Sequence, residues 1–333
     1  MTEHYDDLET RSAGRRESDM IAGIRDQLVN AKANTEAYAD ALKDYDPASF
    51  TGLGDLVSLP VTRKSALMDA QKSNPPFGGY SAIARDQIRY IHVSPGPIDE
   101  ACSHRPDFWR LARAMYAAGF RAGDLVHNGF SYHLTPAGMM LDSGASALGC
   151  GVIPGGVGQT EMQVQTISDL KPDGYVGTPS FLKIVLEKAD EMDLDVSTIT
   201  KGLVSGEALP PPLRQGFSDR GIHVVQAYAT ADLGVIAYET VADHGLVIDE
   251  GVHVEIVRPG SGEPVPDGEV GEVVVTSLNP DYPLIRFATG DMSAIMSGTS
   301  DCGRTNRRIK GWMGRADQTA KVRGMFIHPE PVS

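Results

Sequence analysis

Residues 149–182 read GCGVIPGGVGQTEMQVQTISDLKPDGYVGTPSFL, and this stretch predicts the class of fold. Its first eight residues have the apolar, glycine-bounded pattern of a short buried strand, and a helix is expected from Thr160, with Gln163 at capping-box spacing. A second strand ends at Thr178, an N-cap residue followed by Pro179 at the first helical position. Strand and helix alternate, which is typical of parallel βα units with helices on the faces of the sheet.

The same alternation extends along the middle of the chain, with further strands expected at 87–93, 124–130, 201–207 and 222–229. After Leu233 the helical pattern stops, and strands separated by Gly, Pro and Asp turns predict a small antiparallel barrel or sheet. The expected organisation is a disordered tail over 1–16, a helical and loop segment over 17–86, an α/β core over 87–233, an antiparallel β-barrel over 234–313 and a last segment over 314–333.

Composition narrows the class of protein. A chain of 333 residues exceeds the usual size of one hydrophobic core, so more than one domain or subdomain is expected. The net charge of −14 argues against a nucleic-acid or anionic-membrane partner, because both need a basic surface. The chain shows no apolar run long enough to span a membrane and no signal-peptide core at its start. Its three widely separated cysteines predict free thiols in a cytoplasmic protein without a structural metal site.

Small and polar residues follow two of the predicted strands. SGEAL (205–209) ends one strand and AYATADLG (227–234) ends the next. In an open α/β sheet, ligands bind in the crevice at the carboxyl ends of the strands. A glycine at such an end allows a flat base to approach the backbone, although an ordinary strand-to-helix turn fits SGEAL as well.

RFATGD (286–291) ends in the carboxylate of Asp291. This side chain has two acceptor oxygens and no competing donor, so it can accept more than one hydrogen bond. In isolation, an Asp after Thr-Gly is more often a turn residue.

Together and in this order, these motifs resemble the phenylacetate–coenzyme A ligase family of the adenylate-forming superfamily. The resemblance extends from about Glu17 to Pro329 and is most specific over 149–182. It implies an α/β fold, the N-terminal domain of an adenylate-forming enzyme, with parallel βα layers and a small antiparallel β-barrel. It also implies that ATP and a carboxylate form an acyl-adenylate, whose acyl group then passes to coenzyme A. The implied partners are ATP or AMP, Mg²⁺, coenzyme A and a carboxylic acid, with an aryl acid favoured and a homodimer as a candidate assembly.

The resemblance also assigns roles to individual residues. The nucleotide-binding candidates are Ser205, Gly206, Glu207, Ala208, Tyr228, Ala229, Thr230, Asp291 and Arg315. Asp232 falls where the family holds magnesium, and Asp232 and Arg315 are the catalytic candidates. Ala231 departs from the family's Ser or Thr, whose hydroxyl meets the α-phosphate. Asp317 matches the hinge about which the family's C-terminal lid rotates.

FSYHLTPAG (130–138) aligns with a segment that lines the family's carboxylate pocket. Tyr132 and His133 are therefore candidates to shape an apolar site that tolerates an aromatic acid, although His133 is equally consistent with a structural role. Thr178 and Pro179 are expected in the pocket wall, and Thr178 is expected to cap its helix as well.

YIHVSPGPIDE (90–100) occupies the position of the family's phosphate-binding loop. Ser94 and Gly96 match the family, but Pro95 and Pro97 remove backbone donors. Asp99 and Glu100 add negative charge where phosphates would lie. The sequence therefore predicts a degenerate phosphate loop.

The family continues past the hinge with a lid domain, whereas the given sequence stops at Ser333, so the lid is expected to be absent and the full reaction incomplete. The alternative hypothesis is a non-catalytic protein that binds an adenine nucleotide or an acyl ligand. A Rossmann-type dehydrogenase is disfavoured because no G-x-G-x-x-G follows the first strand.

Overall fold

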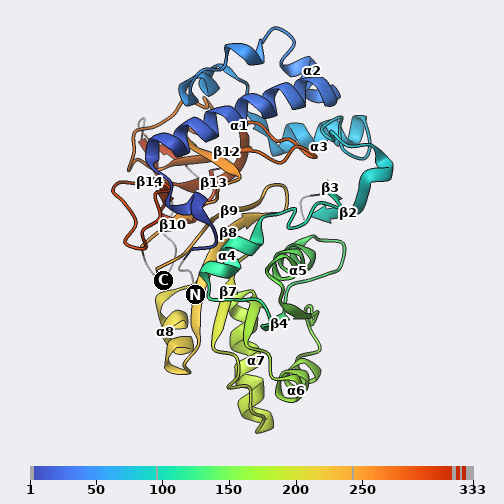
Figure 1. Ribbon diagram of the computed structural model, residues 1–333, viewed down its shortest axis with the longest axis vertical. Coiled ribbons are helices and arrows are strands. Elements are labelled where there is room, and N and C mark those ends of the chain that lie inside the picture. The colour runs from blue at the N-terminus through green and yellow to red at the C-terminus, as the bar shows by residue number, and fades with distance from the viewer. Residues whose placement is uncertain (1–3, 95–96, 242–243, 317–319, 323–324, 328–333) are drawn as a thin grey trace. The chain divides into compact units, whose positions relative to one another are not determined.

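The computed structural model describes residues 4–94, 97–241, 244–316, 320–322 and 325–327 (Figure 1). The chain divides into two compact units. The first consists of the described residues of Met1–Asp6, His92–Gly96 and His104–His244, and the second of those of Asp7–Ile91, Pro97–Ser103 and Gly245–Ser333. The α/β part therefore extends about ten residues beyond the predicted boundary at 233.

A parallel sheet forms the centre of the first unit, as predicted. Its strands are β4 (Leu125–Asn128), β5 (Gly151–Ile153), β6 (Gly174–Gly177), β7 (Lys201–Val204) and β8 (His223–Thr230). They pair in parallel in the order β8-β7-β6-β4-β5, and β9 (Gly234–Tyr238) adds an antiparallel strand beside β8. All five parallel strands thus end at the same edge of the sheet.

The helices of this unit are α4 (Leu111–Ala117), α5 (Ala137–Leu148), α6 (Thr160–Leu170), α7 (Pro179–Met192) and α8 (Pro211–Asp219). Helix α4 packs against α5, and α6 packs against α7 (Figure 1). On α7, Leu182, Val185, Leu186 and Ala189 recur at helical spacing and are buried in the core. Each large apolar side chain that is fully buried contributes about 1.5–3 kcal/mol to the free energy of unfolding.

The two predicted helix starts have different outcomes. Thr178 caps α7 as predicted: its hydroxyl oxygen accepts a hydrogen bond from the Phe181 amide, and proline follows at the first helical position. The capping box predicted at the start of α6 is wrong, because Gln159 is the N-cap residue there and makes no side-chain cap. The Gln163 amide group instead donates to the carbonyl oxygens of Gly156 and Gly158, so it holds the preceding loop.

The second unit contains α1 (Ala13–Asn34), α2 (Glu36–Ala41) and α3 (Lys64–Ser73), together with the 3₁₀ segments Asp7–Thr10, Pro47–Ser49, Leu53–Ser58 and Arg85–Gln87. One sheet has the order β1-β13-β12-β11, with β1 at Thr62–Arg63, β13 at Phe287–Ser293, β12 at Gly271–Ser277 and β11 at Val252–Val257.

Shorter strands complete this unit: β14 (Ile295–Met296), β15 (Arg308–Ile309), β10 (Leu246–Ile248), β16 (Ala320–Val322) and β17 (Met325–Ile327). β15 pairs antiparallel with both β10 and β14, and β16 pairs antiparallel with β17. β11, β12 and β13 are antiparallel as well, so the predicted change from parallel to antiparallel pairing is confirmed.

The predicted disorder of residues 1–16 is wrong for residues 7–16. Glu9 is fully buried, and its carboxylate accepts a hydrogen bond of 2.9 Å from Arg304. Arg11 and Arg16 both pair with Glu250, at 2.7 and 2.6 Å. Helix α1 consequently begins at Ala13 rather than at residue 17. The charges that resembled a solvated tail belong to ion pairs with residues more than 230 positions away in sequence.

The strand predicted at 87–93 exists but does not join the parallel sheet. β2 (Ile88–Ser94) and β3 (Ile98–Ser103) form a separate two-stranded sheet. Asp99 and Glu100 therefore belong to a strand and not to a loop, which corrects their predicted position. Glu100 is buried and Asp99 is half-buried, as expected for neighbours that point to opposite faces.

All three cysteines are free thiols, as predicted. Burial raises the pKa of Cys102 to about 12 and that of Cys150 to about 11. Because the thiolate is the reactive form, neither thiol has the chemistry of a nucleophile at neutral pH.

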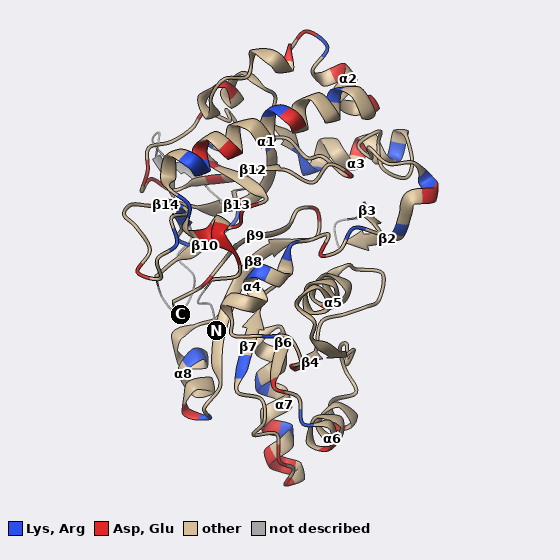
Figure 2. Ribbon diagram, in the orientation of Figure 1, with Lys and Arg blue, Asp and Glu red and all other residues tan. Residues whose placement is uncertain are grey.

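Figure 2 shows Lys and Arg interspersed with Asp and Glu along helices such as α1 and α7. Within the described ranges, no helix combines the length and apolarity that a membrane span requires.

Candidate active site

In the first unit, Ser205 links the ends of three strands. Its amide donates to the Gly177 carbonyl oxygen at the end of β6, and its hydroxyl donates to the Ala227 carbonyl oxygen in β8, at 2.8 Å. Glu207 is exposed next to it, and its carboxylate accepts a 3.3 Å hydrogen bond from the Ser180 amide in the first turn of α7. Gly206 and Ala208 are also exposed. This strand end thus offers backbone and small side chains to a ligand.

The second strand end is the turn between β8 and β9, which carries four further candidates. Tyr228, Ala229, Thr230 and Asp232 are all half-buried, and the register between β8 and β9 shifts between Tyr228 and Ala229. The Thr230 hydroxyl oxygen accepts a 3.2 Å hydrogen bond from the Leu233 amide, which closes the turn. A register shift of this kind bends a strand and re-aims its side chains.

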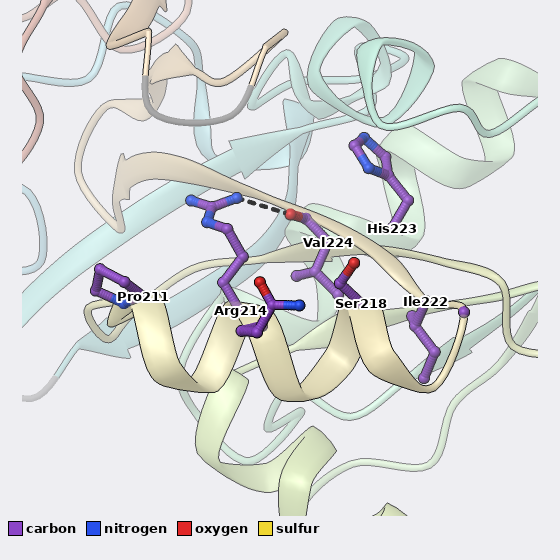
Figure 3. A pocket seen from close by; sticks show the side chains of 8 residues that line it. Pro211, Arg214, Ser218, Ile222, His223 and Val224 are labelled. Carbon is purple, nitrogen blue, oxygen red and sulfur yellow. Dashed lines mark hydrogen bonds between the residues drawn. The ribbon is translucent and has the colours of Figure 1, made fainter.

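A buried ion pair fastens the end of the β8–β9 hairpin that lies opposite the turn. Glu239, directly after β9, is 2% exposed, and its carboxylate accepts hydrogen bonds from the Arg214 guanidinium at 2.8 and 3.0 Å. The same carboxylate accepts from the Gln226 backbone amide at 2.9 Å and from its side-chain amide at 3.1 Å. Arg214 also donates to the Val224 carbonyl oxygen, as Figure 3 shows. Helix α8 and strands β8 and β9 are therefore linked through Glu239.

The two strand ends share a cavity of about 110 Å³. Of the predicted nucleotide-binding residues, Ser205, Gly206, Ala229 and Thr230 line it. The rest of the wall is mostly apolar and comprises Leu111, Phe130, Thr135, Pro136, Ala137, Met140, Leu141, Leu203 and Ala231. The structure therefore brings the strand ends together with the segment 130–141.

Four predicted pocket residues do not line this cavity. The Tyr132 hydroxyl accepts a 2.8 Å hydrogen bond from the Asn128 side chain, and burial raises the pKa of this phenol. His133 is exposed, while Thr178 and Pro179 begin α7. Other residues of the predicted segment 130–138, namely Phe130, Thr135, Pro136 and Ala137, line the cavity instead.

Several of the wall residues that the motifs did not indicate lie on α5, while Leu111 and Leu203 come from α4 and β7. Helix α5 begins at Ala137, and its residues 137, 140 and 141 follow the i, i+3, i+4 spacing of one helical face. This spacing in the sequence indicates that the three residues face the same side of the helix.

Asp291 lies in β13 of the second unit and is held by two donors. Its carboxylate accepts from the Arg315 guanidinium at 3.2 Å and from the Trp312 indole N–H at 3.1 Å. The side chain is 13% exposed, while Trp312 is 53% exposed. The Asp291 amide donates to the Thr289 hydroxyl, and Asp291 forms an isolated β-bridge with Arg315. The structure thus brings the two predicted polar residues of this unit into direct contact.

Three further predictions concern the phosphate loop, the hinge and the metal. Ser94 is the last residue of β2, whereas Gly96 and Asp317 lie outside the described residues. Asp232 lies at the β8–β9 turn, and among the described residues no group of three His, Cys, Asp or Glu side chains could hold a metal by itself.

Larger hollows exist elsewhere in both units. Grooves of about 420 and 480 Å³ lie along α8, the first of them shown in Figure 3, and a cavity of about 330 Å³ lies in the second unit. None of the predicted site residues lines any of these three hollows. We therefore assign the candidate site by its residues and not by volume.

Comparison with known proteins identifies relatives over most of the chain. The family model "AMP-binding enzyme" matches residues 133–279. Phenylacetate–coenzyme A ligase of Aromatoleum evansii is 33% identical over 320 residues, which cover 91% of this chain and 71% of that protein. The enzyme of the same name from Escherichia coli is 30% identical, with 97% and 76% covered.

Solved structures agree with this relationship. A 2-hydroxyisobutyryl-CoA ligase, solved in its postadenylation state with 2-HIB-AMP, superposes with a TM-score of 0.89 at 25% identity. The match covers 98% of this chain and 74% of that chain. An anthranilate CoA ligase bound to anthranoyl-AMP shares the fold at a TM-score of 0.55. The chain belongs to the phenylacetate–coenzyme A ligase family of AMP-binding enzymes.

Proposed function

We propose that this protein is an AMP-forming ligase that activates a carboxylic acid with ATP and transfers the acyl group to coenzyme A. The observation that carries the proposal is the cavity shared by the ends of β7 and β8 and the segment 130–141. Ligands of open α/β sheets bind at this edge, and a small apolar cavity beside an exposed polar strand end suits the tail of an acid.

The proposed chemistry has two displacements. A carboxylate oxygen of the acid attacks the α-phosphorus of ATP, and the bond from that phosphorus to the bridging oxygen breaks, which releases pyrophosphate. The thiol of coenzyme A then loses its proton to solvent, its sulfur attacks the acyl carbon, and the electron pair of the broken acyl–oxygen bond leaves with AMP. Both steps depend on holding the reacting groups in line and excluding water.

We assign the nucleotide to the residues predicted for it. Asp291, oriented by Arg315 and Trp312, accepts hydrogen bonds from the ribose hydroxyls. Tyr228 packs on the adenine, and the segment 205–208 provides the wall beside it. Ala229 and Thr230 lie where this wall opens into the acyl cavity. Arg315 contributes positive charge near the nucleotide and is, with Asp232, a catalytic candidate.

Magnesium is compatible with Asp232, although only with the nucleotide present. Mg²⁺ in nucleotide enzymes is usually bound by one or two carboxylates together with phosphate oxygens and water. A single half-buried carboxylate at the β8–β9 turn fits that pattern, whereas a closed protein site would need several ligands. The bound ion would neutralise charge on the phosphates. The Asp232 carboxylate would be its ligand from the protein.

The test is ATP–pyrophosphate exchange with a panel of carboxylic acids. We expect exchange that depends on the acid, and we expect Asp232→Asn to lower its rate by at least tenfold. Asp190→Asn is the matched control, because Asp190 is an exposed carboxylate of the same unit, at the end of α7. AMP binding without exchange for any acid would instead support the alternative of a non-catalytic nucleotide-binding protein. The degenerate segment 94–100 is the feature that favours this alternative.

The finer predictions are tested separately. Thioester formation, detected by chromatography after incubation with coenzyme A, tests the second step. Light scattering of the purified protein tests the homodimer, and fractionation of the producing cells tests the cytoplasmic location.

A further inference from the structure

The volume of the cavity at the strand ends limits the size of the acid. At about 110 Å³, the cavity is smaller than an engineered apolar cavity of roughly 150 Å³ that binds benzene. A phenyl ring therefore exceeds the available space unless the wall moves.

The cavity wall formed by α5 is closely packed against neighbouring segments and has little room to move. Helix α5 provides Met140 and Leu141, and its glycines lie against neighbouring segments without room for a side chain. A Cβ at Gly144 would lie 2.7 Å from the Leu111 Cβ, and a Cβ at Gly138 would lie 2.8 Å from the Ser131 carbonyl oxygen. The helix is thus held at both ends, against α4 and against the segment before it, and Leu111 is itself part of the cavity wall.

The far side of the cavity is equally constrained. Leu203 belongs to the central strand β7 and is 1% exposed, and Phe130 is 8% exposed. Moving either side chain would disturb the sheet or its covering segment, and close-packed interiors resist such shifts. Met140 is the most adaptable part of the wall, because its unbranched side chain has several rotatable bonds.

We propose that the substrate is a short aliphatic carboxylic acid of about four carbon atoms in all, and not an aryl acid. The estimate scales the benzene-sized cavity to the observed volume. The carboxylate lies at the open side, beside Ser205, Ala229 and Thr230, and the apolar tail fills the space between α5 and β7. This inference rests on the proposed function and specifies its substrate class.

The first experiment measures fit without requiring catalysis. Calorimetry of the wild-type protein compares AMP with hydrolysis-resistant acyl-sulfamoyl adenosines that carry acetyl, isobutyryl, hexanoyl and phenylacetyl groups. We expect the isobutyryl compound to bind at least about tenfold more tightly than both the acetyl and the phenylacetyl compounds, since one methylene in a fitted pocket changes discrimination by about 10–200-fold. Equal or tighter binding of the phenylacetyl compound would overturn the size limit while leaving the ligase proposal intact. Failure to bind AMP and every acyl compound would instead count against the proposed function.

The second experiment enlarges the cavity. Met140→Ala removes three heavy atoms from the wall, so we expect it to bring the phenylacetyl compound to within about threefold of the isobutyryl one. Met115→Ala is the matched control: Met115 is fully buried in α4 of the same unit, does not line the cavity and should leave the wild-type ratio unchanged. An identical shift in both variants would contradict the assigned wall. If Met140→Ala does not fold, the wild-type series alone still decides the proposal.

Discussion

The two units hold their candidate residues in different ways. In the first, the candidates lie at strand ends and in a turn, and hydrogen bonds of the backbone and of side chains such as Ser205 and Thr230 fix them. In the second, a single carboxylate, Asp291, is positioned by the exposed Trp312 and by Arg315. The first arrangement depends on the stability of the fold, whereas the second depends on a few local contacts. Substitutions in the two units should therefore affect different measurements.

The largest effect is expected for Glu239→Ala in the first unit. The variant leaves the 14%-exposed Arg214 guanidinium without its carboxylate, and breaking a buried pair typically costs about 3–5 kcal/mol. Chemical denaturation should show this loss in the free energy of unfolding.

The exposed pair between Arg220 and Asp190 provides the control for Glu239. It also joins the end of α8 to another element, but its side chains are 40% and 60% exposed. Asp190→Ala should lower the free energy of unfolding by no more than about 1 kcal/mol. Similar losses for Asp190→Ala and Glu239→Ala would contradict the view that burial of the pair stabilises this unit.

In the second unit, Asp291→Ala should change binding and hardly change stability. Losing charge-assisted hydrogen bonds to the ribose hydroxyls should weaken AMP binding by about 2–4 kcal/mol, or roughly 30- to 1,000-fold. Calorimetry measures the affinity, and Asp267→Ala, which removes an exposed carboxylate paired with Arg307, is the control. Unchanged AMP affinity in Asp291→Ala would remove the ribose assignment.

The sequence predicted what is local and periodic. The parallel strands and the Thr178 cap both follow from spacing within one element or one βα unit. It could not predict the pairing of Glu9 with Arg304, 295 residues apart, because a charged segment has the same pattern whether it is solvated or paired. The side chain of Gln163 was misassigned because two hydrogen-bonding roles fit one spacing.

The candidate site was predictable to a similar extent. The strand ends at 205–208 and 228–232 were located from the order of the elements, and the segment 130–138 from the resemblance. Which side chains of that segment face the cavity depends on how α5 packs against α4, and this is a tertiary contact. Tyr132 was a reasonable candidate, but Asn128 engages its hydroxyl away from the cavity wall.

A third prediction concerns the effect of pH on the second unit. Burial, together with the nearby positive charge of Arg307, lowers the pKa of His253 in β11 from 6.5 to about 4. The unfolded chain therefore binds a proton near pH 6.5 that the folded protein does not, so stability is complete above 6.5 and is lost as pH falls. Between pH 6.5 and 4.5 this residue should account for about 2 kcal/mol of lost stability. Urea titrations give the free energy of unfolding at each pH. As pH falls, the value for wild type should approach that for His253→Asn. The difference between wild type and a His223→Asn control should stay constant.

Thr178 tests a smaller effect in the first unit. Thr178→Ala removes the N-cap of α7 and should cost about 1 kcal/mol in the free energy of unfolding. Thr178→Ser keeps the hydroxyl and should restore most of this loss. Because Thr178 does not line the cavity, neither variant should alter the preference among acyl groups. A changed preference in Thr178→Ala with unchanged stability would return this residue to the pocket wall.

The smallest effect is expected for Asp99→Asn, although the sequence placed this residue among the phosphates. The Asp99 backbone is bound on both sides by the Gln71 side chain, which donates to its carbonyl oxygen at 2.7 Å and accepts from its amide at 2.9 Å. Asp99 also alternates with the buried Glu100 along β3, so the two carboxylates cannot both face one ligand. Neutralising Asp99 should therefore change the affinities for ATP and AMP by less than about twofold each, which corresponds to about 0.4 kcal/mol. Calorimetry with both nucleotides tests this prediction. A selective gain in ATP affinity would mean that β3 directs the charge of Asp99 toward the nucleotide. The second unit would then also position a charge through a strand, and the two units would differ less in how they hold their candidate residues.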